Sequence, residues 1–113
     1  MQQVVDLQSD DGFFAAGVEL VSVSPDPLEA WTAAAKQFGV RGTLYSDPGN
    51  EAASRFDLLR WAMPSGEPGH TFVLIDGAGV IRWIRDYGAP ENGGVMYVDP
   101  QSITSQVTHA LSR

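Results

Sequence analysis

One segment, residues 69–83, constrains the fold more than any other part of the chain. It reads GHTFVLIDGAGVIRW, an apolar run followed by a glycine-rich turn and a second run in which apolar residues alternate. Two such runs joined by a short turn that contains glycine are typical of a β-hairpin. We therefore expect strands at Thr71–Ile75 and at residues 80–85, antiparallel to each other, with the turn at residues 77–79.

Three Asp-Pro pairs mark the expected starts of helices. Asp is favoured as an N-cap because its carboxylate accepts backbone N–H groups, and Pro suits the first helical position. The pairs are Asp26-Pro27, Asp47-Pro48 and Asp99-Pro100. We expect the first helix to run to about Phe38, with Glu29 completing a capping-box-like arrangement and Gly39 ending the helix.

Apolar residues recur at helical spacing after each of these starts, which predicts one buried face per helix. The predicted faces are Leu28, Trp31, Ala35 and Phe38 in the first helix, Ala52, Phe56 and Leu59 in the second, and Ile103, Val107 and Leu111 in the third. A further helix is predicted over residues 1–16, with an imperfect apolar face.

The remaining apolar segments are predicted strands. Residues 18–24, between Gly17 and Pro25, are mostly apolar or β-branched. Such a run favours a strand that is buried on both faces, and hence a parallel sheet. Residues 43–45 form a short extended piece. This order of elements predicts one α/β domain over residues 1–113, with a mixed sheet flanked by helices.

Composition excludes several classes of function. The net charge is −7, from seven basic and fourteen acidic residues, so phosphate backbones and anionic membrane surfaces would be repelled. No apolar segment approaches the roughly 18 residues that span a bilayer, and the first residues lack a signal-peptide pattern. We therefore expect no nucleic acid and no membrane as partner, and a cytoplasmic location by default.

The chain contains no cysteine, which excludes disulfides, thiolate metal sites and thiol catalysis by these residues. His70 and His109 are far apart in sequence, so we expect no metal site and no cofactor. Ser22, Ser24, Asp26 and His70 are the residue types of a hydrolase triad. No Gly-x-Ser-x-Gly elbow surrounds either serine, which favours the interpretation of a strand end and a helix cap.

Three stretches resemble, in order, parts of one known family. They are GVELVSVSPDPLEAW from Gly17, TLYSDPGNEAASRFDLLR from Thr43, and the hairpin. Together they resemble the peroxiredoxin-like (alkyl hydroperoxide reductase / thiol-specific antioxidant) branch of thioredoxin-fold proteins, over roughly residues 13–83. The resemblance implies a thioredoxin-like fold and thiol-dependent peroxide reduction, yet the peroxidatic cysteine is absent.

The resemblance also implies a missing strand. Residues 2–14 resemble the tail of the cysteine-bearing helix, and the strand that precedes this helix in the family is not in the sequence. In the thioredoxin fold this strand is central. It lies between the strand that residues 18–24 resemble and the strand that Thr71–Ile75 resembles. Three outcomes follow: the two strands close on each other, a segment of another chain fills the slot, or the chain is part of a longer protein. We expect a homo-oligomer or swapped dimer, with another protein as an alternative partner.

His70 and Thr71 are the candidate cleft residues. They occupy the place where the resembled proteins carry a cis-proline followed by threonine, often beside an active-site arginine, and here Gly69-His70 replaces both. His70 is either a donor or acid–base group at the cleft mouth or a polar residue that ends a loop. The resulting hypothesis is a truncated antioxidant-family domain with no catalytic residue, inactive alone. The alternative is a non-catalytic interaction or dimerisation module.

Overall fold

The computed structural model describes residues 2–66 and 69–112. This part of the chain contains five α-helices, four strands and three short 3₁₀ turns. The predicted mixed α/β fold class is therefore confirmed. The elements are α1 (Gln2–Gln8), α2 (Asp11–Ala15), β1 (Val21–Ser24), α3 (Leu28–Phe38), β2 (Thr43–Ser46), α4 (Glu51–Arg55), β3 (Thr71–Ile75), β4 (Ile81–Asp86) and α5 (Pro100–Leu111).

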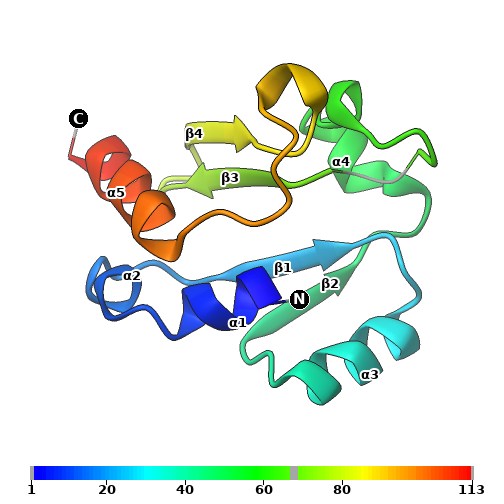
Figure 1. The fold of residues 1–113 in the computed structure, drawn as a ribbon, viewed down its shortest axis with the longest axis horizontal. Helices are drawn as coiled ribbons and strands as arrows, with labels where there is room; N and C mark the ends of the chain where they lie inside the picture. Colours follow the sequence, from blue (N-terminus) through cyan, green and yellow to red (C-terminus); the bar gives the residue numbers. More distant parts are fainter. Residues whose placement is uncertain (1, 67–68, 113) are drawn as a thin grey trace.

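The strands form two separate pairs (Figure 1). β1 and β2 are parallel, with Val23 opposite Tyr45. β3 and β4 form the expected antiparallel hairpin, and a register irregularity falls between Leu74 and Ile75. Both the parallel pair and the hairpin are therefore confirmed.

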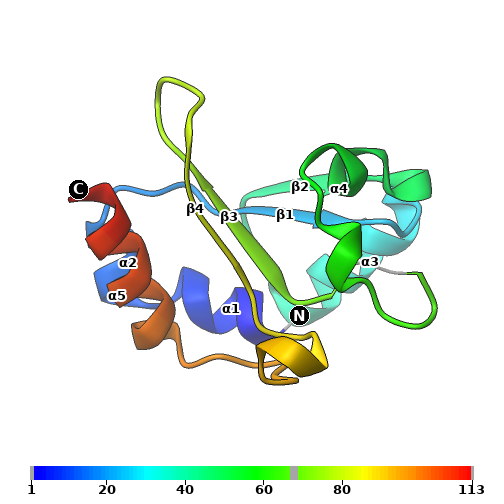
Figure 2. The same cartoon turned by 90° about the horizontal axis from the view of Figure 1, so that it is seen from above.

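Strands β1 and β3 do not pair with each other in the described part of the chain. Direct closure of the two, one of the three outcomes derived from the sequence, is therefore wrong. Figure 1 shows the β3–β4 hairpin above the β1–β2 pair, with the arrows of β1 and β3 pointing in opposite directions. In Figure 2, α1, α2 and α5 lie on one side of the strands and α4 lies on the other.

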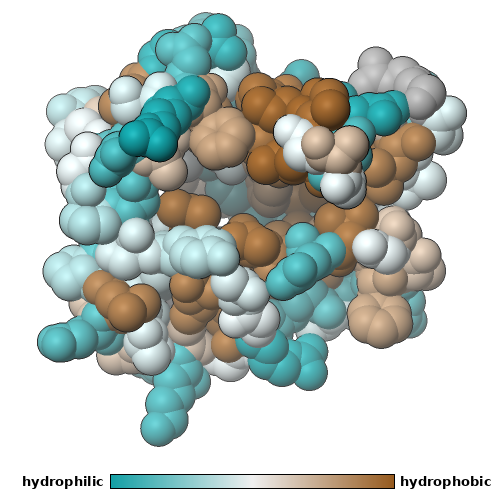
Figure 3. Space-filling model, turned by 180° about the vertical axis from the view of Figure 1, so that it is seen from behind, coloured by the Kyte–Doolittle hydropathy of each residue, from teal (hydrophilic) through white to brown (hydrophobic). Residues whose placement is uncertain are grey.

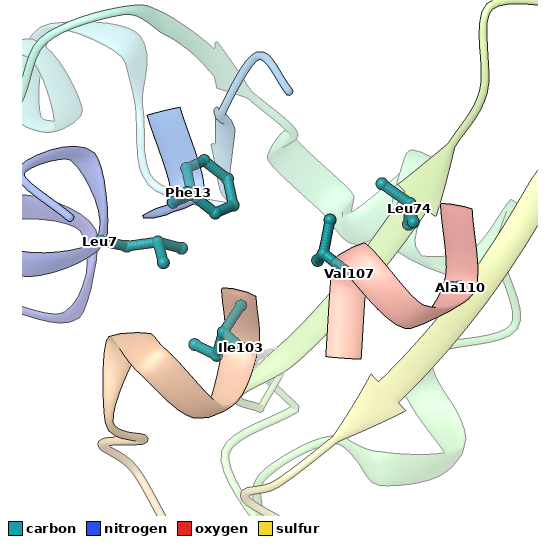
Figure 4. Packing of buried hydrophobic residues seen from close by; sticks show 6 residues of the cluster. All are labelled: Leu7, Phe13, Leu74, Ile103, Val107 and Ala110. Atoms are coloured by element: carbon teal, nitrogen blue, oxygen red, sulfur yellow. The ribbon is translucent and has the colours of Figure 1, made fainter. Parts of the chain in front are cut away.

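The hydrophobic core lies between β3 and the three helices on that side. Figure 4 shows how its side chains converge from α1, α2, β3 and α5. The most buried large side chains are those of Leu7 in α1 and Ile103 in α5. The core also contains Phe13, Leu74, Val107 and Ala110. Residues more than 90 positions apart in the sequence thus form a single cluster.

Asp99-Pro100 acts as expected at a helix start, and Asp47-Pro48 does so only in part, because α4 begins at Glu51 with Asn50 as its N-cap. The carboxylate of Asp99 accepts the N–H of Gln101 at the start of α5. The buried carboxylate of Asp47 accepts the N–H groups of Ala52 and Ala53 at 2.9 and 3.1 Å, although a 3₁₀ turn separates Asp47 from α4. The helix there is short and ends at Arg55, before the predicted face is complete.

The expectation that Asp26 caps a helix starting at Pro27 is wrong. Pro27 is itself the N-cap of α3, without a side-chain hydrogen bond, and the helix begins at Leu28. The carboxylate of Asp26 instead accepts a hydrogen bond from the Ser24 hydroxyl at 2.9 Å. The short Asp–Ser contact competes with capping, as such local bonds commonly do. Gly39 does end the helix, in the left-handed conformation at φ 79°.

Several other expectations are corrected. The single helix expected over residues 1–16 is instead two short helices, Gln2–Gln8 and Asp11–Ala15, because Asp10 caps a new helix by accepting the N–H of Phe13. The strand expected over residues 18–24 begins only at Val21, and its two valines are exposed, not buried on both faces. The side chains expected in the core but found exposed are Leu28, Phe38 and Leu111.

Two substitutions in α5 test the core. Ile103→Ala should lower the free energy of unfolding by about 2–5 kcal/mol, because it leaves a cavity among fully buried neighbours. Leu111→Ala is the matched control in the same helix. Its side chain is 38% exposed, so we expect a loss of about 1 kcal/mol or less. Chemical denaturation followed by circular dichroism measures both, and equal losses would contradict this core.

Candidate functional site

The most prominent hollow of the molecule separates the two strand pairs. It is a cavity of about 890 Å³, lined along its length by residues of β1 and β3 and on one side by the core helices. Figure 3 views this region from behind, where a hollow crosses the middle of the face and hydrophobic side chains gather along its edges. The cavity thus lies between β1 and β3, which do not pair with each other in the described residues.

Both candidate residues, His70 and Thr71, lie at this cavity. His70 directly precedes β3, and its carbonyl oxygen accepts the N–H of Tyr87 at 2.8 Å, which extends the hairpin ladder by one bond. The imidazole packs edge-on against Phe72, with ring centroids 5.1 Å apart, and beside Tyr87 at 6.3 Å. Its orientation is therefore fixed by aromatic neighbours.

The hydrogen-bond partner of the His70 ring is Gln3 of α1. Gln3 is buried, and its side-chain amide pairs with the backbone of Val98: its Nε2 donates to the Val98 carbonyl at 2.9 Å, and its Oε1 accepts the Val98 N–H at 2.6 Å. These two bonds fix which atom of the amide is the oxygen. His70 Nε2 lies 3.0 Å from this oxygen, so we assign the ring proton to Nε2.

Burial lowers the pKa of His70 below its ordinary value, and the nearby negative charge of Asp86 opposes the shift only in part. The ring is therefore neutral at pH 7 and donates through Nε2. A neutral imidazole with a fixed proton can orient a bound group. The Nε2 proton is already donated to Gln3, so the remaining ring nitrogen, Nδ1, is a hydrogen-bond acceptor, and no cysteine is present for it to activate.

Asp86, at the end of β4, organises the backbone beside His70. Its carboxylate is only 2% exposed and accepts hydrogen bonds from the Thr71 hydroxyl at 2.7 Å, the Ala89 N–H at 2.9 Å and the Asn92 amide at 3.0 Å. Burial alone would raise the pKa of Asp86, but these donors outweigh it and the net pKa is lowered. Thr71 is thus occupied in holding Asp86.

The residues of a hydrolase triad are not assembled. Ser24 and Asp26 bond to each other, and the ring of His70 bonds to Gln3. Ser22 lines the same cavity as His70 without sharing a hydrogen bond with it in the described structure. His109 is exposed in the last turn of α5. Over residues 2–66 and 69–112, no three acidic or histidine side chains are grouped to hold a metal ion.

A parallel strand pair and an antiparallel hairpin, covered by helices, place the chain in the class of α/β proteins with a truncated thioredoxin-like fold. Residues 1–84 match the model of the AhpC/TSA family, and the chain belongs to this family. A comparison with curated proteins finds no match. Among the described helices, none has the length and apolar character needed to cross a bilayer.

Three residues of this site were missed in the sequence. Gln3 stands in a helix where nothing distinguishes it from the neighbouring glutamine, and Asp86 ends a strand without a motif. Trp31 was assigned to the core, and it is buried, but its side chain also lines the cavity. The one signal for Asp86 is the sequence Asp-Tyr-Gly-Ala-Pro, which starts at the last residue of β4 and is typical of a carboxylate that accepts N–H groups of a following turn.

The pKa shift of Asp86 predicts a pH dependence. Because its folded-state pKa is lowered, the carboxylate contributes stability above its unfolded pKa of about 3.9, and this contribution is lost as the pH falls through the lower, folded pKa. Asp86→Asn should reduce the free energy of unfolding by about 1–3 kcal/mol at pH 6 and should flatten its fall below about pH 4. Denaturant titrations at several pH values measure both effects.

The control for this prediction is Asp57→Asn. Asp57 is exposed and makes only a surface ion pair with Arg60 at 3.8 Å, which contributes about 1 kcal/mol or less. An Asp86 variant with the same stability and pH profile as this control would show that the buried carboxylate does not hold the loop.

Proposed function

We propose that residues 1–113 form one redoxin-like domain of an antioxidant protein family, and that the chain alone does not reduce peroxides with thiols. The observation that carries the proposal is the absence of any cysteine in a chain of the AhpC/TSA family. Thiol-dependent reduction requires a thiolate to attack the peroxide oxygen, and no other side chain here supplies an equivalent nucleophile.

His70 and Thr71 have supporting roles in this proposal. His70 is a neutral ring whose Nε2 proton is donated to Gln3, and Thr71 positions Asp86 and the loop that follows β4. Neither has the positive charge by which an arginine would polarise a peroxide. A thiol that acted in this cavity would therefore have to come from outside these residues.

The purified chain should show no peroxide consumption above the uncatalysed rate with hydrogen peroxide or an organic hydroperoxide and a thiol donor such as dithiothreitol. A cysteine-containing thiol peroxidase assayed in parallel is the control. Because His70 is not expected to do chemistry alone, His70→Gln should give the same background rate. Measurable turnover by the purified chain that is saturable in peroxide would overturn the proposal.

A second candidate function is a non-catalytic module for protein interaction or dimerisation. Open strand edges favour it, since unpaired backbone groups and exposed apolar side chains promote association. In the described residues, β2 pairs only with β1, so its outer edge is open. The strand carries no charged residue, and Tyr45 on it is 57% exposed. The edge thus lacks the charges that commonly prevent pairing with a second copy.

For this candidate we expect a homodimer with a mass of about 24 kDa, twice the 12.2 kDa of the chain. Tyr45→Lys places a charge on the β2 edge and should shift the mass towards the monomer. Light scattering coupled to size exclusion, over a wide range of concentrations, measures the mass. A monomer at every concentration would contradict self-association, and a dimer unchanged by Tyr45→Lys would place the contact elsewhere.

The remaining parts of the proposal concern partners and location. The net charge of −7 argues against nucleic acid and anionic membrane surfaces as partners. A cytoplasmic location stays a prediction, to be checked by cell fractionation.

A further inference from the structure

The two strands that border the cavity each have one unpaired edge. Within the described residues, β1 bonds only to β2 and β3 only to β4, so both strands direct backbone N–H and C=O groups towards the space between them. Two-stranded sheets are marginal by themselves, and an edge that faces a hollow is a template for an added strand. The arrangement fits one extended segment, which would join the two pairs into a single five-stranded sheet.

The side chains along the cavity suit an apolar segment. Leu7, Phe13 and Val107 lie on its core side. Val21, Val23 and Ile75, which come from the two bordering strands, are 42, 55 and 48% exposed. β-Branched side chains with this exposure are typical of strands that lack a neighbour. In a segment whose alternate residues are apolar, the apolar side chains would cover the core side of the cavity. The other side chains would point towards the open side of the cavity.

Trp31, beside the cavity, has an unpaired polar group. Trp31 of α3 is only 8% exposed and lines the cavity, and its indole Nε1 has no hydrogen-bond partner. Buried N–H groups are nearly always bonded, and an unpaired one costs free energy. This nitrogen has almost no accessible surface, so a segment in the cavity would reach it only if the Trp31 side chain moved.

The charges of the lining indicate which end of the segment is basic. Glu19 and Asp76 are the only Asp, Glu, Lys or Arg residues among the described lining residues. Glu19 precedes β1 and Asp76 follows β3, and because these strands run in opposite directions, both acids lie at the same end of the cavity (Figure 1). The carboxylate of Asp76 accepts the N–H groups of Ala78 and Val80 at 2.9 Å and pairs with Arg82 at 3.5 Å. Glu19 accepts only the Thr43 hydroxyl, at 3.1 Å, and is therefore the more available acid.

We propose that the cavity between β1 and β3 binds an extended segment of another polypeptide, about five or six residues long, apolar at alternate positions and with Lys or Arg at the end that meets Glu19 and Asp76. The length follows from β3, which has five residues. A second copy of this chain is the less favourable occupant of the cavity, because its open β2 edge, of sequence TLYS, carries no Lys or Arg to meet Glu19. This inference rests on the interaction function proposed above and names its partner.

The test uses fluorescent peptides and the intact chain. Because a segment in either direction is parallel to one bordering strand and antiparallel to the other, both acetyl-Lys-Val-Thr-Val-Thr-Val-amide and the reversed order are required. Fluorescence anisotropy should show saturable one-to-one binding of at least one of them. Replacing Lys by Glu should weaken that binding on the order of tenfold, and replacing either of the two middle residues by Pro should abolish it.

Two variants distinguish this cavity from the β2 edge. Val23→Arg places a bulky charge inside the cavity and should abolish peptide binding. Tyr45→Lys adds a charge on the residue opposite Val23 in β2, outside the cavity, and should leave peptide binding unchanged. Ile75→Arg, on the other bordering strand, is the second cavity variant if Val23→Arg does not fold by circular dichroism.

Two spectroscopic readouts report the added strand directly. Amide hydrogens of β1 and β3 should become protected from exchange when the peptide binds, and the indole N–H resonance of Trp31 should shift. Binding without these changes would place the peptide elsewhere and overturn the proposal.

Three other results would overturn it. One is no saturable binding of either Lys peptide up to about 1 mM. Another is binding that Val23→Arg and Ile75→Arg leave intact. The third is a dimer that these variants convert into a monomer while no peptide binds, which would make a second copy the occupant. Peroxide turnover and the mass of the Tyr45→Lys variant are measured separately. A failure of the peptide-binding proposal is therefore distinguishable from a failure of the proposed function.

Discussion

The unsatisfied backbone at the edges of β1 and β3 is the constraint on which the rest of this molecule depends. A buried N–H or C=O without a partner costs about 1–3 kcal/mol, so a sheet cannot be left open inside a closed core. The chain accommodates the gap by keeping the two strand pairs apart, with a cavity of about 890 Å³ between them. The exposed valines of β1 are a direct consequence, since no strand covers them.

Polar contacts hold together the helix and hairpin segments on one side of this gap. Gln3 joins α1 to the segment before α5 through Val98, and to the start of β3 through His70. Asp86 joins β3 to the loop after β4. Such buried networks stabilise only when every member is bonded. His70, which occupies a position near the active site in the resembled proteins, thus helps to hold the structure together in this chain.

Much of the fold could be predicted from local patterns. The hairpin was predictable because its turn and its alternation are both encoded within 15 consecutive residues, and Asp99 caps α5 because the cap and the helix are adjacent. The start of α3 was not predictable, because Ser24 competes for Asp26. The candidate site was predictable only in part: His70 and Thr71 do lie at the cavity, but Gln3 bonds to His70 across 67 positions of sequence.

By itself the sequence determined the type and order of most elements, the family resemblance and the absence of a thiol, because these depend on residue identity and on spacing within a few turns of chain. Only the tertiary structure decided that β1 and β3 stay apart, that Leu111 is exposed, and that Trp31 keeps an unpaired indole N–H beside the cavity. These features depend on which distant segments pack together, and a strand edge or a buried donor is satisfied or left open only when the whole chain has folded.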